Sequence, residues 1–437
     1  MSASNLHAIG QPGNHNRVEH AIPETVQETG LGAQFLLNFL LKAIYLFGVE
    51  TIGQAEEELK LTRGVLSELL ELAREKRLVE VLGLIDSRSS DYRYALTPEG
   101  RKWALDALEQ SKYAGPAPVA LDEYQAQVVR QSVANERVDS AMLADAVSHL
   151  VLPDETVARL GPALNAGKAI LLYGEPGNGK TSTAVALSSC FHQTILVPYC
   201  IVSDGQIVKM FDPAVHEPCE EPGGEPASHD RRWVRCRRPS VLTGGELTLE
   251  MLDLSVDPTT RICEAPAHIK ATNGIFIIDD FGRQRVAPRD LLNRWLLPLE
   301  RGIDYLTMPT GKKLKMPFDQ VVVLSTNTPP LELMDRAALR RIDYKVHLSV
   351  PSRADYLNIL ERVCRENGLE LPRPLAEHIL ARYQRAGIPH SGSDPRFLVE
   401  HVIARSTFEN VPTQLTQEFV DDAFQNLLIA ETSAPTL

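Results

Sequence analysis

The sequence lacks the cysteine spacing that marks a metal site or a disulfide framework. Its 437 residues include six cysteines, which form no CxxC pair and no cluster with the spacing of metal ligands. This pattern argues against a structural zinc site, and we expect reduced thiols in a cytoplasmic protein. The six are Cys190, Cys200, Cys219, Cys236, Cys263 and Cys364.

An excess of positive charge is also missing. The chain has 45 lysines and arginines against 57 aspartates and glutamates, a formal net charge of −12. This balance argues against wholesale non-specific binding to nucleic acid, although it permits a local basic patch. The fractions of hydrophobic and charged residues, 43% and 23%, are those of an ordinary globular protein with room for two or three domains.

The sequence contains no long uninterrupted apolar run. Residues 1–30 are polar and have no signal-peptide core, so we expect a flexible N-terminus. The most apolar segment, residues 31–48, carries Gln34, Asn38 and Lys42 at every fourth position. Because this spacing places a polar stripe along one side of a helix, it predicts an amphipathic helix and no membrane insertion.

What the chain does contain is a glycine-rich phosphate-binding pattern, the Walker A motif. Residues 169–187 combine a short apolar run, a turn with three glycines and a helix-compatible segment. Such a turn directs backbone N–H groups and a helix N-terminus toward one anion. Lys180 would add a charge for the β- and γ-phosphates of ATP, and the Thr181 hydroxyl would hold Mg²⁺. The expected binding residues are Gly174, Glu175, Pro176, Gly177, Asn178, Gly179, Lys180, Thr181 and Ser182.

A second acidic signature follows about a hundred residues later. Four apolar residues, Ile275–Ile278, predict a central strand, and Asp279 and Asp280 follow it directly. Ligands bind at the carboxyl ends of strands in an open α/β sheet, so Asp279 is expected to hold the Mg²⁺ water shell as a Walker B aspartate does. A buried strand that ends in a polar turn is the alternative interpretation.

The order of the later motifs resembles that of AAA+ ATPases of bacterial type. The resemblance covers about residues 138–430. Residues 321–327, with Asn327 at the tip, are similar to the sensor-1 strand of that family. Residues 335–342 are similar to the helix that presents arginine fingers to a neighbouring subunit. Residues 393–397 are similar to the sensor-2 region at the start of a lid helix.

The resemblance implies an α/β P-loop core, with a parallel sheet flanked by helices, over residues 138–350 and a helical lid over 351–437. It implies a homo-oligomeric ring, a hexamer by family resemblance, that hydrolyses ATP with Mg²⁺. The implied catalytic residues are Lys180, Asp279, Asp280, Asn327, Arg340 and Arg341, and Arg396 would contact the nucleotide of its own subunit. Asp280 departs from the family, in which most members have Glu, so slow hydrolysis stays open.

Residues 31–112 resemble a winged-helix-like α+β domain. The segment has 11 basic and 13 acidic residues, a net charge of 11 − 13 = −2. This balance favours a protein-docking or structural role over binding of DNA, although both interpretations stay open. The expected helices are Ala33–Phe47, Ile52–Leu59 and 62–76, followed by strands at 78–85 and Tyr92–Leu96 around a polar turn at 86–91, and by a helix that starts at Thr97.

Residues 113–137 form a predicted linker, which we expect to be stiff and extended up to about Val133 because it contains Gly115-Pro116-Ala117-Pro118. After the phosphate loop, 194–201 predict the second strand of the core. Within an insertion at 203–245, we expect a hairpin arm at 205–211, a mobile loop at 217–230 and a helix that opens at Thr243. Residues 303–317 predict a hairpin before sensor 1, and the basic loop 281–285 would face a pore or cap the next helix.

Five arginines surround a tryptophan in residues 231–238. This cluster would bind nucleic acid or an acidic partner, or else form a solvated edge or pair with the acidic loop before it.

Three functions of the whole protein therefore stay open. They are an oligomeric ATPase that remodels an unidentified protein client in a chaperone-like way, a nucleotide-gated DNA-binding regulator or loader, and an ATP-binding scaffold with low turnover.

Overall fold

The computed structural model describes residues 22–84, 92–219 and 229–432, which fall into two compact units. The first unit comprises the chain up to Asp106 together with Ala114–Ala117 and Glu220–Trp233. The second comprises Ala107–Tyr113, Pro118–Cys219 and Val234–Leu437. Three sequence predictions concern residues outside the described part: residues 1–21 of the flexible N-terminus, the turn at 86–91, and most of the loop at 217–230.

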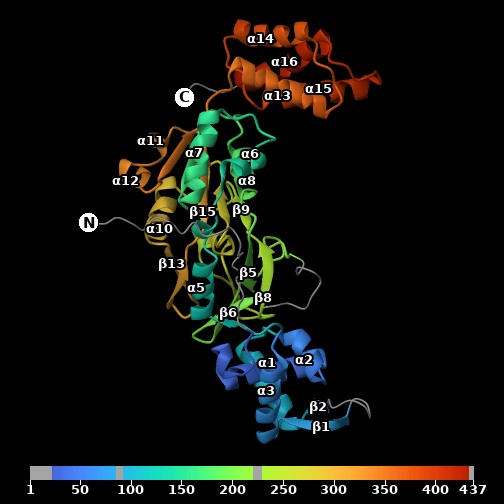
Figure 1. Cartoon of the computed structure of the whole chain (residues 1–437), viewed down its shortest axis with the longest axis vertical. Helices are drawn as coiled ribbons and strands as arrows, with labels where there is room; N and C mark the ends of the chain where they lie inside the picture. The colour runs from blue at the N-terminus through green and yellow to red at the C-terminus, as the bar shows by residue number, and fades with distance from the viewer. Residues whose placement is uncertain (1–21, 85–91, 220–228, 433–437) are drawn as a thin grey trace, which may run out of the picture. The chain divides into compact units, whose positions relative to one another are not determined.

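The first unit has the element order that the sequence predicts. Thr51 begins its second helix with a capping box, in which its side chain and that of Gln54 bond reciprocally to the backbone. Thr62 caps the third helix by accepting a hydrogen bond from the N–H of Val65. The elements are α1 (Ala33–Phe47), α2 (Ile52–Leu59), α3 (Arg63–Glu75), the antiparallel strands β1 (Val79–Leu84) and β2 (Tyr92–Leu96), and α4 (Pro98–Gln110), which belongs to this unit up to Asp106 (Figure 1).

Residues 22–30 pack against α3. The Thr62 hydroxyl donates to the carbonyl of Pro23 at 2.6 Å, and Glu68 accepts from the N–H of Val26 at 3.0 Å. A side chain at Gly64 would lie 2.3 Å from the carbonyl oxygen of Glu24, so only glycine allows this approach. This part of the predicted flexible N-terminus therefore has specific contacts.

No single helix among the described residues has the length and hydropathy of a membrane span. Helices α1 and α2 have that length and hydropathy only when they are taken together, and a bend of 105° separates them. Much of α1 is buried, including Leu36, Leu37 and Leu40.

The second unit is built on a five-stranded parallel sheet. Successive apolar side chains along its strands point alternately to the two faces of the sheet, and each face is covered by helices. Ile275 and Ile277 face the cluster that contains Leu164 and Leu187, whereas Phe276 and Ile278 face the cluster that contains Trp295. The strand order is β16 (Tyr344–His347), β4 (Ile170–Tyr173), β15 (Val321–Thr326), β12 (Ile275–Ile278) and β9 (Ser240–Thr243). The flanking helices include α6 (Ser140–Ala146), α7 (Asp154–Asn165), α8 (Lys180–Ser188) and α10 (Pro288–Arg301) (Figure 1).

The edge strand of this sheet differs from the sequence prediction. The predicted second strand at 194–201 is split into β5 (Thr194–Pro198) and β6 (Cys200–Ser203), and neither joins the main sheet. β9 takes the edge position instead, where Val241 pairs with Phe276. Thr243 is therefore the last residue of β9 and opens no helix, since its hydroxyl bonds to the carbonyl of Ile277 at 3.3 Å.

The segments between α8 and β12 form further strands. The predicted hairpin arm is present as β6 paired with β7 (Gln206–Lys209), around a turn in which Asp204 and Gly205 have positive φ. A second five-stranded sheet has the order β10 (Ser255–Asp257), β11 (Ile262–Glu264), β7, β6 and β3 (Val119–Ala120). β5 pairs with β8 (Trp233–Arg237), and short helices η4 (Glu250–Leu252) and α9 (Ala267–Lys270) follow.

The predicted linker 113–137 is not simply extended. It contains β3, the helix α5 (Leu121–Arg130) and the short turn η2 (Val133–Asn135). Acidic Asp122 and Glu123 lie in the first turn of α5, where they complement the helix dipole. This segment is thus an integral part of the second unit beyond Pro118.

The C-terminal region has the helices that the apolar spacing predicts. Their shared core includes Tyr356, Leu360, Tyr383 and Phe424. The preceding segment contains the predicted hairpin, β13 (Ile303–Thr307) with β14 (Lys313–Pro317), and the short helices α11 (Pro330–Leu333) and α12 (Arg336–Leu339). The C-terminal helices are α13 (Arg353–Glu366), α14 (Arg373–Ala386), α15 (Asp394–Glu409) and α16 (Gln417–Thr432) (Figure 1).

Candidate nucleotide-binding site

The phosphate loop connects the carboxyl end of β4 to the N-terminus of α8. Gly177 and Gly179 have φ values of 77° and 75°, a left-handed conformation that favours glycine. A side chain at Gly177 would also lie 2.1 Å from the Ser391 hydroxyl. These two glycines therefore allow the chain to turn sharply into α8, whose free N–H groups can bind an anion.

Lys180 is the first residue of α8, and its side chain lies within the loop. Its ammonium donates to the carbonyls of Gly174 at 3.0 Å and Glu175 at 2.7 Å. Burial lowers the pKa of Lys180, and the nearby carboxylates of Asp279, Asp280 and Glu175 oppose that shift. A phosphate group could therefore replace these two carbonyls as the partner of the Lys180 ammonium.

Thr181 brings the loop to the acidic strand end. Its hydroxyl donates to the carboxylate of Asp279, with distances of 2.9 and 2.8 Å to the two oxygens. A hydroxyl and a carboxylate are hard oxygen donors, and Mg²⁺ commonly binds to proteins through one or two such groups together with phosphate oxygens and waters. The predicted Mg²⁺ residues therefore lie together and fit the ion chemically.

Asp280 and Asn327 also lie together. They follow β12 and β15, which are neighbours in the sheet, and the Asn327 amide donates to a carboxylate oxygen of Asp280 at 3.1 Å. The carboxyl ends of parallel strands meet at one edge of the sheet, which explains this contact between residues 47 positions apart.

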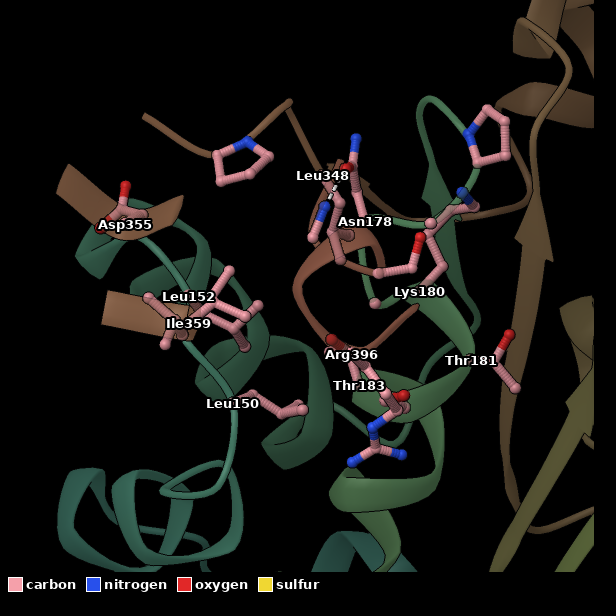
Figure 2. Close-up of a pocket in the computed structure, with 18 of the residues that line it drawn as sticks. Leu150, Leu152, Asn178, Lys180, Thr181, Thr183, Leu348, Asp355, Ile359 and Arg396 are labelled. Atoms are coloured by element: carbon pink, nitrogen blue, oxygen red, sulfur yellow. Dashed lines mark hydrogen bonds between the residues drawn. The ribbon is translucent and has the colours of Figure 1, made fainter. Parts of the chain in front are cut away.

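These groups line one cavity of about 950 Å³ (Figure 2). Figure 2 labels Asn178, Lys180 and Arg396 among the polar residues that line it, and Leu150, Leu152 and Ile359 among the apolar ones. The volume and the mixture of apolar wall and convergent polar groups suit a nucleotide-sized ligand. The cavity is lined among others by Gly177, Asn178, Gly179, Lys180, Thr181, Ser182, Asp279, Asp280, Asn327 and Arg396.

Asn178 supplies a direct sign that the loop fits an anionic ligand. Its Nδ2 is buried and has no hydrogen-bond partner among the described residues, whereas its Oδ1 accepts from the N–H of Gly392 at 3.4 Å. The hydroxyl of Ser391 also reaches the carbonyl of Pro176, at 3.4 Å. A buried donor without a partner is unfavourable, and a phosphate oxygen would satisfy it.

Arg340 and Arg341 lie outside this cavity in their own chain. Arg340 is exposed at the end of α12, which Asp335 caps. Arg341 is half-buried, donates to the carbonyl of Ala337 at 3.0 Å, and has its Nε 3.9 Å from a carboxylate oxygen of Glu300. Neither arginine lines the cavity with Lys180.

The arginine cluster at 231–238 does not form one basic face. Arg232 is completely buried against Asp230 at 2.7 Å, and Arg238 is buried against Glu136 at the same distance. Arg237 is exposed, 3.6 Å from Glu217. Pairing with the acidic segment just before the cluster, one of the alternatives, therefore accounts for Arg232 and Arg237.

Sequence reasoning missed Gln284. This residue is 9% exposed, and its amide contacts the backbone of the segment that carries both aspartates. A lone glutamine between two arginines gives no sequence signal for such a contact. Only the folding of the loop back on itself reveals it.

The fold and the site define the class of protein. The parallel sheet flanked by helices, the phosphate loop after β4, the acidic end of β12 and the helical C-terminal region are the features that the resemblance implied. The chain therefore has an α/β fold with a parallel sheet flanked by helices and a phosphate loop, as the resemblance to AAA+ P-loop ATPases implied.

Comparison with known proteins adds little beyond this class. A family model described as "Domain of unknown function (DUF8689)" matches residues 352–426. A search of curated proteins found no match.

Among solved structures, a mutant of RuvB from Thermotoga maritima is 15% identical and covers 68% of this chain and 73% of its own, with a TM-score of 0.35. NtrX from Brucella abortus in complex with ATP is 14% identical and covers 74% of this chain and 62% of its own, with a TM-score of 0.37. The "Holliday junction branch migration motor" RuvB of Thermotoga maritima is 15% identical and covers 63% and 70%, with a TM-score of 0.36. Scores this low support no statement about function, so the class rests on the strand order and the phosphate loop.

Proposed function

We propose that this protein binds ATP and hydrolyses it with Mg²⁺ as an oligomeric AAA+ ATPase, and that hydrolysis drives remodelling of a protein partner. The observation that carries the proposal is the contact between Thr181 and Asp279, which joins the phosphate loop to the acidic strand end. Two hard oxygen ligands meet there beside a lysine and a helix N-terminus.

Phosphoryl transfer depends mainly on position and on neutralisation of charge. The loop N–H groups and Lys180 would bind the phosphates, and Thr181 and Asp279 would hold Mg²⁺. When bound, the ion neutralises charge on the β- and γ-phosphates. Asp280 would orient the attacking water and accept its proton, and Asn327 would hold the Asp280 carboxylate by the amide contact described above.

Each active site would need a residue from a second copy of the chain. Arg340 and Arg341 are absent from the cavity of their own chain, whereas Arg396 lines it. We propose that Arg340 or Arg341 reaches the γ-phosphate in the adjacent protomer of a homo-oligomeric ring, while Arg396 contacts the nucleotide of its own subunit. A hexamer is the size that the family resemblance implies.

The winged-helix-like region would serve as the adaptor for a protein client. Exposed apolar side chains on β1 and β2 support this role, since exposed apolar residues on neighbouring strands are available to a protein partner. They are Val81, Leu82, Leu84 and Tyr92, which are 40–52% exposed. DNA gating has less support, because Arg232 and Arg238 are buried in ion pairs and cannot contact phosphates.

The test is ATP turnover per protomer over a concentration series. We compare the parent with Lys180→Ala, with the double variant Arg340→Ala/Arg341→Ala, and with Arg385→Ala, an exposed arginine of α14, as the matched control. Specific activity should rise with concentration, vanish in the lysine variant, fall in the double variant and return when these two inactive proteins are mixed. The control should behave as the parent.

Other outcomes separate the alternatives. Near-zero turnover with tight ATP binding would replace the motor with a scaffold of low turnover. Activity that is independent of concentration and not restored by mixing would contradict shared sites. Turnover that rises with duplex DNA, and a DNA affinity that falls with salt and on Arg235→Ala/Arg237→Ala, would favour the DNA-binding regulator.

A further inference from the structure

The backbone at Asp280 has an unusual conformation. Its φ is 47°, in the left-handed region, where an L side chain crowds the following carbonyl. Asp tolerates this region better than most residues, but the surroundings must still hold it there. The direction of the Asp280 carboxylate therefore depends on whatever fixes the backbone after β12.

Gln284 makes the contacts that can fix it. Its amide nitrogen donates to the carbonyl of Asp279 at 2.9 Å and to that of Asp280 at 3.2 Å, with Gly244 at 3.4 Å as a weaker third partner. Its amide oxygen accepts from the N–H of Gly282 at 2.8 Å. One buried side chain thus bonds to the backbone on both sides of the left-handed residue.

Strand β15 holds the same segment from the other side. The carbonyl of Ser325 accepts from the N–H of Phe281 at 2.6 Å, and the hydroxyl of Thr326 donates to the carbonyl of Phe281 at 2.8 Å. These contacts fix Phe281 but leave the carbonyls of Asp279 and Asp280 to other donors. Gln284 donates to both carbonyls, and the N–H of Arg283 also donates to that of Asp280, at 2.9 Å.

We propose that Gln284 is a positioning residue for ATP hydrolysis, which acts by holding Asp280 in its left-handed conformation so that the carboxylate faces the attacking water. This inference rests on the proposed function, because it assigns Gln284 a part in that reaction. Gln284 itself does not line the cavity, so it acts only through Asp280. Loss of its amide would free the Asp280 backbone to relax and would move the carboxylate away from the water.

The experiment compares two substitutions of buried glutamines. Gln284→Met keeps the length and volume of the side chain but removes its hydrogen bonds. Gln320→Met is the matched control, because Gln320 is 4% exposed and donates to the carbonyl of His268 at 3.0 Å, before the start of β15 and outside the cavity. For each protein we measure kcat and KM for ATP, the Kd for ADP with Mg²⁺, and the melting temperature.

We expect kcat to fall about 10- to 100-fold in Gln284→Met, since a displaced catalytic group commonly has an effect of this size. The Kd for ADP should stay within threefold of the parent value, because the phosphate loop is untouched. Gln320→Met should keep the parent kcat. If Gln284→Met has a lower melting temperature than the parent, kcat is measured instead in Gln284→Ala, whose smaller side chain cannot overpack the loop.

A kcat within threefold of the parent value would overturn the positioning role. So would losses of kcat and ADP affinity in equal proportion, or the same kcat loss in Gln320→Met, since these would indicate a general structural effect. The parent protein separates this inference from the proposed function. If the parent binds ATP but does not hydrolyse it, the proposed function fails and the role of Gln284 fails with it.

Discussion

The hydroxyl of Thr181 lies 2.9 and 2.8 Å from the two carboxylate oxygens of Asp279, a residue 98 positions later in the chain. This contact links the first residues of α8 to the end of β12. It brings the two expected Mg²⁺ ligands together, so the dependence of turnover on Mg²⁺ should be sensitive to either side chain.

Thr181→Ala should reduce Mg²⁺-dependent turnover by at least tenfold, because the ion loses one of its protein ligands. Measuring turnover against Mg²⁺ concentration tests this, and the Mg²⁺ requirement should shift upward. Ser188→Ala is the matched control. It removes a hydroxyl from the same helix, and within the described part of the chain that hydroxyl bonds to the carbonyl of Val185. An unchanged Mg²⁺ titration in Thr181→Ala would contradict the assignment.

Asp280→Asn should separate nucleotide binding from hydrolysis. The amide cannot accept the proton of the attacking water, and loss of a general base commonly lowers kcat by about 10²- to 10⁴-fold. ATP affinity, measured by equilibrium titration with Mg²⁺, should change little because Lys180 and the loop remain. If Asp280→Asn hydrolyses ATP at the parent rate, another group must orient the water.

Substitution of Arg238, which forms an ion pair with Glu136, should destabilise the second unit more than substitution of an exposed arginine of the cluster. The Nε–Oε2 distance of the pair is 2.7 Å, and both side chains are almost fully buried. Arg238→Met leaves the Glu136 charge buried without its partner and should lower the free energy of unfolding by about 3–5 kcal/mol. Urea denaturation measures this loss.

Arg237→Met is the control for that measurement, because Arg237 is 72% exposed and 3.6 Å from Glu217. Its effect should stay below about 1 kcal/mol, as for other exposed pairs. Equal losses from the two substitutions would show that burial does not set the contribution of these arginines.

Stability should fall as the pH drops from 7 to 5, in part through His268. Burial lowers the pKa of His268 below its ordinary value of 6.5 despite the hydrogen bond to Asp304, and Arg294 adds to the shift. In this window the unfolded chain binds a proton that the folded state does not, so stability is present above pH 6.5 and is lost on acidification. The slope from one such group is at most about 1.4 kcal/mol per pH unit.

Melting curves against pH check this dependence. His268→Gln should flatten the slope between pH 7 and 5, whereas His192→Gln, at an exposed position, should keep it. His216 also has a pKa lowered by burial, so part of the slope should persist in His268→Gln. If His268→Gln has the same slope as the parent, protonation of His268 does not contribute to the loss of stability on acidification.

Local patterns in the sequence predicted most of the elements. The apolar spacing of α13 and α15, the helix start at Thr97 and the glycine spacing of the phosphate loop each depend on neighbouring residues, and the structure has all of them. Predictions that depended on distant pairing were weaker. The strand at 194–201 was placed in the wrong sheet, and Thr243 ends a strand where a helix was expected.

The sequence by itself determined the local patterns of the candidate site, because a glycine-rich turn before Lys180 and Thr181, and carboxylates after an apolar strand, are short-range patterns. Tertiary structure alone decided which strand forms the sheet edge, that Arg238 pairs with Glu136 at a separation of 102 residues, and that Gln284 holds the backbone of Asp280. The physical reason is that strand pairing and buried polar contacts are selected by competition among many partners, which only the packed chain resolves.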